Sequence, residues 1–142
     1  MYNTIFLDAN VLADIYDEQR PHCIHSRKTI KHLLAQESVE LYTSCDIITT
    51  LYYINARIDK QKALDHIIEI NRWCKIIEFG NTEVSQSCQL MKKNPKFTDL
   101  EDTIQYVMAK KVEADLIFSN DTAFVSEEIE LMSTAGFCET LQ

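Results

Sequence analysis

The chain of 142 residues has few residues that interrupt regular structure: only two glycines and two prolines. Because these residues are the main turn formers and helix breakers, their scarcity predicts helices and short strands joined by brief connections. The sequence also lacks an uninterrupted run of about 18 apolar residues, so no membrane-spanning segment is expected. Its first residues lack a basic region, and their apolar run is broken at Asp8, unlike a signal peptide. We therefore expect a cytoplasmic protein.

Cysteines in a metal or disulfide pattern are absent as well. The five cysteines are scattered, odd in number and never spaced as Cys-x-x-Cys, which predicts free thiols in a reducing compartment. Basic residues are not in excess either: the formal net charge is −8, whereas passive nucleic-acid binding usually requires a basic surface. This charge is compatible with an acidic site neutralised by metal, with a basic partner, or with a soluble surface.

The hydrophobic pattern predicts the fold class. Apolar residues make up 46% of the chain, as in globular proteins, and the length suits a single domain over residues 1–142. Short apolar runs predict strands at 4–7, 39–42, 75–79 and 114–118, and segments of helical periodicity lie between them. The first run is continuous rather than alternating, as in a strand buried on both faces. We expect a three-layer α/β/α sandwich with a mostly parallel central sheet.

Capping signals indicate where helices begin. Ser44 and Asp59 are placed to cap the two helices after the second strand. Residues 98–101 match a capping box at the start of a later helix. The expected inner stripe of the helix after Asp59 consists of Ala63, Leu64, Ile67, Ile68 and Trp73. After the fourth strand we expect one short helix, followed by a last strand near Phe137.

Four aspartates stand where parallel α/β sheets bind ligands, at the carboxyl ends of strands. Asp8 directly follows the first strand and Asp121 follows the fourth by two polar residues, while Asp99 and Asp102 share a face at a helix start. Converging carboxylates repel one another unless a cation neutralises them, and hard oxygen ligands favour Mg²⁺ or Mn²⁺. Such an ion supports phosphodiester hydrolysis, so we take these four aspartates as candidate catalytic and metal-binding residues.

Each acid also has a structural explanation. Asp8 and Asp121 are placed to cap the helices that follow them, and capping together with the helix dipole explains Asp99. Asp102 lies past the positions where a cap acts. Taken singly these signals are weak, and it is their combination at strand ends that favours a site.

Three segments, in this order, resemble motifs of PIN-domain proteins: residues 6–14 (FLDANVLAD), 98–106 (TDLEDTIQY) and 114–124 (ADLIFSNDTAF). The resemblance implies a Mg²⁺- or Mn²⁺-dependent ribonuclease with a parallel sheet. Many members of this family are bacterial VapC-type toxins that act on RNA, commonly form homodimers and are held inactive by a small antitoxin protein. Carried over to this sequence, Asp8 is the first ligand, Asp102 the acid at the helix start, Asp99 its neighbour and Asp121 the last acid.

Two positions depart from the family pattern. The family usually has a glutamate in the helix after the second strand, where this sequence has Thr50, and Asp46 one turn earlier is a possible substitute. Many relatives also carry a further aspartate where this chain has Ala123. The site therefore holds fewer negative charges than the fullest version in the family, and a metal is expected to bind less tightly.

Two alternative functions stay open at this point. One is a PIN-like module for RNA binding or protein interaction that has lost activity together with its glutamate ligand. The other is a phosphatase or phosphotransferase, although the step Asp8-Ala9-Asn10 lacks the second aspartate that such a phosphatase requires. Because the overall charge is unfavourable for RNA, local basic residues must steer it, and the candidates are Arg20, Arg27, Lys28, Lys31, Lys92, Lys93 and Lys96.

Overall fold

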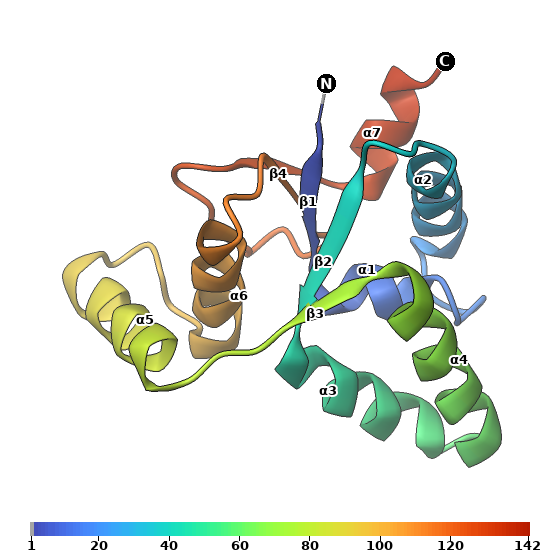
Figure 1. The fold of residues 1–142 in the computed structure, drawn as a ribbon, viewed down its shortest axis with the longest axis horizontal. Helices are drawn as coiled ribbons and strands as arrows, with labels where there is room; N and C mark the ends of the chain where they lie inside the picture. Colours follow the sequence, from blue (N-terminus) through green and yellow to red (C-terminus); the bar gives the residue numbers. More distant parts are fainter. Residues whose placement is uncertain (1) are drawn as a thin grey trace.

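A central sheet of five strands organises the molecule (Figure 1). The computed structural model describes residues 2–142. The strands are β1 (Thr4–Leu7), β2 (Glu40–Ser44), β3 (Lys75–Ile77), β4 (Leu116–Phe118) and β5 (Glu130–Met132). Their order is β3-β2-β1-β4-β5 and every neighbouring pair is parallel. All carboxyl ends therefore lie at one edge of the sheet.

Helices cover both faces of this sheet, which confirms the predicted α/β/α architecture. They are α1 (Ala9–Asp14), α2 (Cys23–Leu34), α3 (Cys45–Ala56), α4 (Lys60–Trp73), α5 (Asn81–Lys93), α6 (Leu100–Lys111) and α7 (Thr134–Thr140). In Figure 1, α5 and α6 lie on one side of the strands, and α2 and α7 lie on the other. The helices α3 and α4 pack against each other. None of the helices in residues 2–142 is long and apolar enough to cross a membrane.

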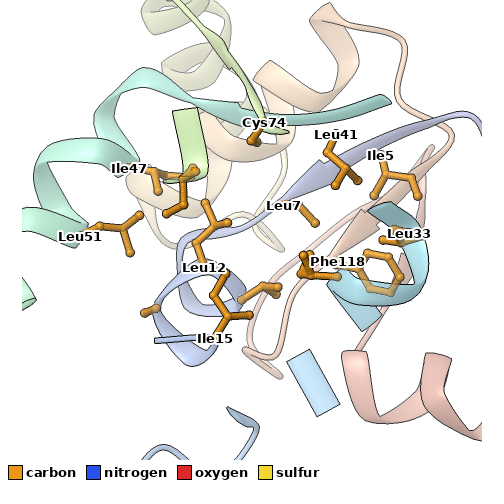
Figure 2. Packing of buried hydrophobic residues seen from close by; sticks show 14 of the residues in the cluster. Ile5, Leu7, Leu12, Ile15, Leu33, Leu41, Ile47, Leu51, Cys74 and Phe118 are labelled. Atoms are coloured by element: carbon orange, nitrogen blue, oxygen red, sulfur yellow. The ribbon is translucent and has the colours of Figure 1, made fainter. Parts of the chain in front are cut away.

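Side chains of the central strands point alternately into two hydrophobic cores. Ile5 and Leu7 of β1 join Phe118 of β4 in the core beneath α1, α2 and α7 (Figure 2). Phe6 and Ile117 point the opposite way and pack with residues of α6. All five side chains are fully buried. A strand covered on both faces needs an apolar residue at every position, and this explains the continuous apolar run of the sequence.

Some predicted helix details are confirmed and others are wrong. Asp59 caps α4, because its carboxylate accepts hydrogen bonds from the backbone N–H groups of residues 61 and 62. Ser44 lies at the expected N-cap position of α3, but its buried hydroxyl makes no capping bond among the described residues. The capping-box prediction was wrong in register, because Asp99 rather than Thr98 is the N-cap of α6.

Two other predictions are wrong. Leu64 and Ile68 were expected on the inner stripe of α4, yet they are 43% and 51% exposed, and the buried residues of this helix are Ala63 and Ile70. The order of the last elements is also reversed: β5 comes first, and Phe137 lies in α7, where its ring meets that of Phe118 edge to face. All five cysteines are free thiols, as predicted.

Candidate active site

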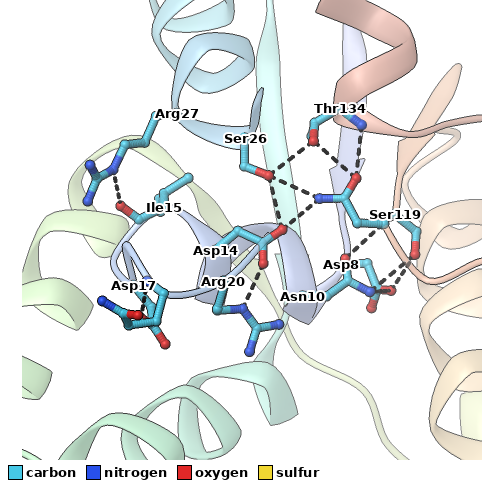
Figure 3. Close-up of polar contacts among 12 residues, drawn as sticks. Asp8, Asn10, Asp14, Ile15, Asp17, Arg20, Ser26, Arg27, Ser119 and Thr134 are labelled. Atoms are coloured by element: carbon cyan, nitrogen blue, oxygen red, sulfur yellow. Dashed lines mark hydrogen bonds and ion pairs between the residues drawn. The ribbon is translucent and has the colours of Figure 1, made fainter. Parts of the chain in front are cut away.

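Asp8 directly follows β1 at the carboxyl edge of the sheet and is only 4% exposed. Its Oδ1 accepts a hydrogen bond from the backbone N–H of Ala9 (2.8 Å), and its Oδ2 accepts from the hydroxyl of Ser119 (2.8 Å) and the side-chain amide of Asn10 (2.9 Å). Asn10 and Ser119 lie next to Asp8 in Figure 3. The carboxylate is therefore held in one orientation by two strand ends, β1 and β4.

The pKa of Asp8 is raised, chiefly because burial disfavours its charged form. The hydrogen bonds from Ser119 and Ala9 act in the opposite direction, and the nearby carboxylate of Asp121 raises the pKa further. A buried carboxylate with another acid close by is an unfavourable arrangement for a protein without a bound cation.

Asp102 shows the same effect more strongly. It stands on the first turn of α6, half-buried, and its pKa is raised to about 7. Burial is the largest cause, followed by repulsion from the carboxylates of Asp8, Asp99, Asp121 and Glu101. Asp99 itself caps α6, since its Oδ1 accepts a hydrogen bond from the backbone N–H of Asp102 (2.9 Å). Asp99 therefore both caps α6 and belongs to the group of acidic residues around Asp102.

All four predicted aspartates border one depression of about 310 Å³, which we call the acidic pocket. Its lining consists of Asp8, Ala9, Asn10, Ala13, Arg20, Ile54, Asp99, Glu101, Asp102 and Asp121. A second hollow of about 300 Å³ shares Asp99, Asp102 and Asp121 with it and extends along Phe97 and Val125. The structure thus brings the four residues together, while their roles as ligands and catalysts stay a prediction.

The chemistry of this pocket suits a hard divalent cation. Within residues 2–142, no three Asp, Glu, His or Cys side chains are placed closely enough to form a ready-made metal cage. Mg²⁺ does not need one, because it retains several waters and binds through one or two carboxylates. Five carboxylates around one pocket, one of them with a pKa of about 7, supply oxygen donors and an electrostatic reason to take up a cation. The residues present therefore fit such an ion.

Neither of the two departures from the family pattern lines the acidic pocket. Thr50 is on α3, where its hydroxyl donates to the backbone carbonyl of Asp46 (3.3 Å). The carboxylate of Asp46 accepts from the side-chain amide of Gln105 (3.1 and 3.2 Å) and is not part of the pocket lining. As placed, it does not substitute for the missing glutamate. Ala123 lines the second hollow and brings no charge to it.

Several residues of the site were not among the four predicted ones. Glu101, the last residue of the capping box expected at 98–101, also lines the pocket. Asn10 and Ser119 orient Asp8 through their side chains. The signal for both was present in the sequence, since each is a polar residue within three positions of a buried strand end. Of the basic residues proposed to steer RNA, Arg20 lines the acidic pocket.

A larger cavity of about 510 Å³ lies elsewhere, between α5 and α6. Its lining mixes Lys110 and Lys111 with Glu83, Glu127 and Glu128, and includes none of the four aspartates. Cavity size therefore does not identify the site, and the convergence of strand ends and carboxylates does.

Comparison with known proteins agrees with this arrangement. A family model described as PIN domain matches residues 5–126. The chain is 47% identical over 135 residues to the protein named Ribonuclease VapC1 of Aquifex aeolicus (strain VF5), which covers 95% of this chain and 93% of that protein.

Solved structures share the fold at much lower sequence identity. Mycobacterium tuberculosis VapC20, a sarcin-ricin loop cleaving toxin, has a TM-score of 0.68 and 15% identity, covering 84% of this chain and 92% of that chain. A toxin-antitoxin complex from Klebsiella pneumoniae has a TM-score of 0.67 and 12% identity, covering 92% of this chain and 97% of that chain. These two likenesses concern the fold alone. The family match and the 47% identity to the Aquifex protein show that the chain belongs to the PIN-domain family.

Proposed function

We propose that this protein is a ribonuclease that hydrolyses RNA phosphodiester bonds with Mg²⁺ or Mn²⁺ bound in the acidic pocket. The observation that carries the proposal is the convergence of Asp8, Asp99, Asp102 and Asp121 on one pocket at the carboxyl edge of the sheet. The 47% identity to a protein named Ribonuclease VapC1 supports RNA as the substrate. Ribonucleases of the VapC type generally depend on a divalent metal, which agrees with the carboxylate chemistry of the pocket.

In this proposal Asp8 and Asp102 hold the metal ion, and Asp121 and Asp99 assist them. Such an ion, when bound, polarises a phosphoryl oxygen and lowers the pKa of a coordinated water. The hydrogen bonds from Ser119 and Asn10 fix the orientation of the Asp8 carboxylate. Preorganisation of this kind lowers the cost of arranging the charged groups at the moment of reaction.

Asp102 has a second role that follows from its pKa. Its pKa is raised to about 7, chiefly by burial, so that its carboxyl group is partly protonated in the metal-free protein near neutral pH. A cation binds the deprotonated form, so metal uptake is accompanied by proton release from Asp102. Metal affinity is therefore expected to increase as the pH rises from 6 to 8.

The partners follow from the same family. We infer that the chain is a single domain, acts in the cytoplasm as the toxin of a toxin–antitoxin pair, and forms a homodimer. The likeness of its fold to a toxin-antitoxin complex from Klebsiella pneumoniae supports a protein antitoxin as its inhibitor.

Cleavage of mixed RNA in the presence of Mg²⁺ or Mn²⁺ tests the proposal directly. The Asp8→Asn variant should lose activity, whereas Asp115→Asn should retain it. Asp115 is a suitable control because it is an exposed aspartate whose carboxylate accepts the backbone N–H groups of Asn3 and Thr4, at the opposite end of the strands. Equal cleavage by wild type and Asp8→Asn would reject the assignment of the site.

Metal titration separates this proposal from a non-catalytic PIN-like module. Saturable Mn²⁺ binding that Asp8→Asn abolishes supports the enzyme. Absence of binding at millimolar Mn²⁺ would favour an RNA-binding or protein-interaction module that has lost its glutamate at position 50.

A further inference from the structure

The acidic pocket has one cationic residue in its described lining, Arg20, against five carboxylates. This imbalance matters for a substrate with a negatively charged backbone, because an RNA phosphate entering the pocket is repelled by the acids. A divalent ion would offset only part of that charge. A guanidinium at the wall of the pocket is therefore placed where a phosphate needs a favourable contact.

Arg20 is held in place by a buried acid that belongs to no part of the acidic cluster. It lies between α1 and α2, and its Nε donates to Oδ1 of Asp14 at 2.7 Å. Asp14 is 2% exposed and its Oδ2 accepts from the hydroxyl of Ser26 (3.1 Å) and the side-chain amide of Asn120 (2.6 Å). Figure 3 shows Asp14 between Arg20 and Ser26.

This arrangement uses only one nitrogen of the guanidinium. Among residues 2–142, the terminal nitrogens Nη1 and Nη2 of Arg20 donate no hydrogen bond, and the side chain is 33% exposed. Because the group is planar and Nε is fixed, its two terminal nitrogens have a defined direction. A pair of parallel N–H donors is the geometry that binds two oxygens of one phosphate.

An arginine is not required at position 20 merely to neutralise Asp14. The carboxylate of Asp14 already accepts hydrogen bonds from two neutral side chains, and the ammonium group of a lysine could supply the positive charge equally well. Arg27 provides the contrast: its Nε donates to the backbone carbonyl of Ile15 (2.8 Å), its Nη1 lies 3.6 Å from Glu18, and it does not border the acidic pocket.

We propose that Arg20 is a phosphate-binding residue of this site, which contacts the RNA backbone beside the acidic pocket through Nη1 and Nη2 while Asp14 positions it. The inference rests on the proposed function, because RNA is the substrate assigned there. It goes further by naming the residue whose positive charge offsets the repulsion between the carboxylates of the pocket and an RNA phosphate.

Binding of a fluorescein-labelled single-stranded RNA of 12 nucleotides tests it without depending on catalysis. Fluorescence anisotropy is measured in Mg²⁺ with the Asp8→Asn protein, and Arg20→Lys, Arg20→Gln and Arg72→Gln are each added to that background. We expect Arg20→Gln to weaken binding about tenfold, as for one charged hydrogen-bonded contact. Arg20→Lys should recover only part of this loss, since a lysine lacks the fork. Arg72 is an exposed arginine in the last turn of α4, and Arg72→Gln should stay within about twofold of the parent.

Salt dependence distinguishes a phosphate contact from a structural role. Loss of one contact to a single-stranded backbone lowers the slope of log affinity against log salt concentration by about 0.7. Arg20→Gln should show this change, whereas a variant that merely loosens the fold should not. Arg20→Gln leaves the buried carboxylate of Asp14 without its cationic partner, which could destabilise the protein. The double variant Asp14→Asn/Arg20→Gln removes both charges, so that RNA binding can be measured on a folded protein.

The outcomes separate the two proposals. Normal RNA binding by the folded double variant, or an unchanged salt slope in Arg20→Gln, would overturn the role of Arg20 even if the wild-type protein cleaves RNA. The absence of RNA binding by the Asp8→Asn parent would overturn it as well. Weaker binding with the lower slope would support it even if no cleavage were observed, a result that would count against the ribonuclease proposal alone.

Discussion

Replacement of Asp102 by asparagine should make the metal-free protein more stable at pH 8. The carboxyl group has a pKa of about 7 in the folded protein, compared with its ordinary value of 3.8. The unfolded chain therefore loses this proton at lower pH than the folded protein does. Stability contributed by the neutral form is present below pH 4 and is lost as the pH rises from about 4 to 7. At pH 8 Asp102 is ionised in the folded protein, and its charge destabilises the fold to the full extent.

The size of this cost follows from the same pKa. The difference between 3.8 and about 7 corresponds to roughly 4 kcal/mol for a fully buried group. Asp102 is only half-buried, so solvent screening reduces this value, and the charge also gains about 0.3–1 kcal/mol from the amino end of α6. We expect Asp102→Asn to stabilise the protein by about 1–2 kcal/mol, which raises Tm by about 3–6 °C for a chain of this length.

Thermal unfolding followed by circular dichroism in EDTA measures this difference at pH 8 and at pH 4.5. The increase in Tm should be clear at pH 8 and much smaller at pH 4.5, where Asp102 is already neutral in the folded protein. Glu101→Gln is the matched control, since Glu101 is exposed on the same helical turn, and it should change Tm by less. Addition of Mg²⁺ should stabilise wild type more than Asp102→Asn. A lower Tm for Asp102→Asn at pH 8 in EDTA would refute the account of repelling carboxylates.

Three further substitutions test the core, the polar network and the incomplete ligand set. Phe118→Ala removes a fully buried ring of β4 and should lower the free energy of unfolding by about 3–5 kcal/mol in urea titration. Asn120→Ala removes a donor to Asp14 and should cost about 1–3 kcal/mol in the same assay. Thr50→Glu should tighten Mn²⁺ binding about tenfold by calorimetry, because Ile54, one helical turn further, lines the acidic pocket; unchanged affinity would contradict this placement.

The sheet could be predicted because its central strands are buried on both faces. Phe6 and Leu7 belong to different cores, yet both must be apolar, and this requirement is visible in the sequence as a continuous run. The last elements gave no such signal. The strand β5 has three residues, two of them exposed, and Phe137 is a single apolar residue with no period around it.

Which apolar residues of a helix are covered could not be predicted in the same way. The period of α4 indicates a helix, but Leu64 and Ile68 are exposed because no described element covers that side of it. Periodicity states which residues share a face, whereas burial depends on what the rest of the chain places against that face.

The residues of the candidate site also differ in how far the sequence could predict them. Asp8 and Asp121 could be located because the carboxyl ends of parallel strands meet at one edge, a rule that needs only the order of elements. The support for Arg20 could not, because it depends on Asp14 meeting Asn120, which lies 106 positions further along the chain. No local pattern encodes that contact. A buried acid that fixes a guanidinium at the wall of an acidic pocket becomes visible only when the strand ends are brought together, and for this reason sequence reasoning counted Arg20 among seven equivalent basic residues.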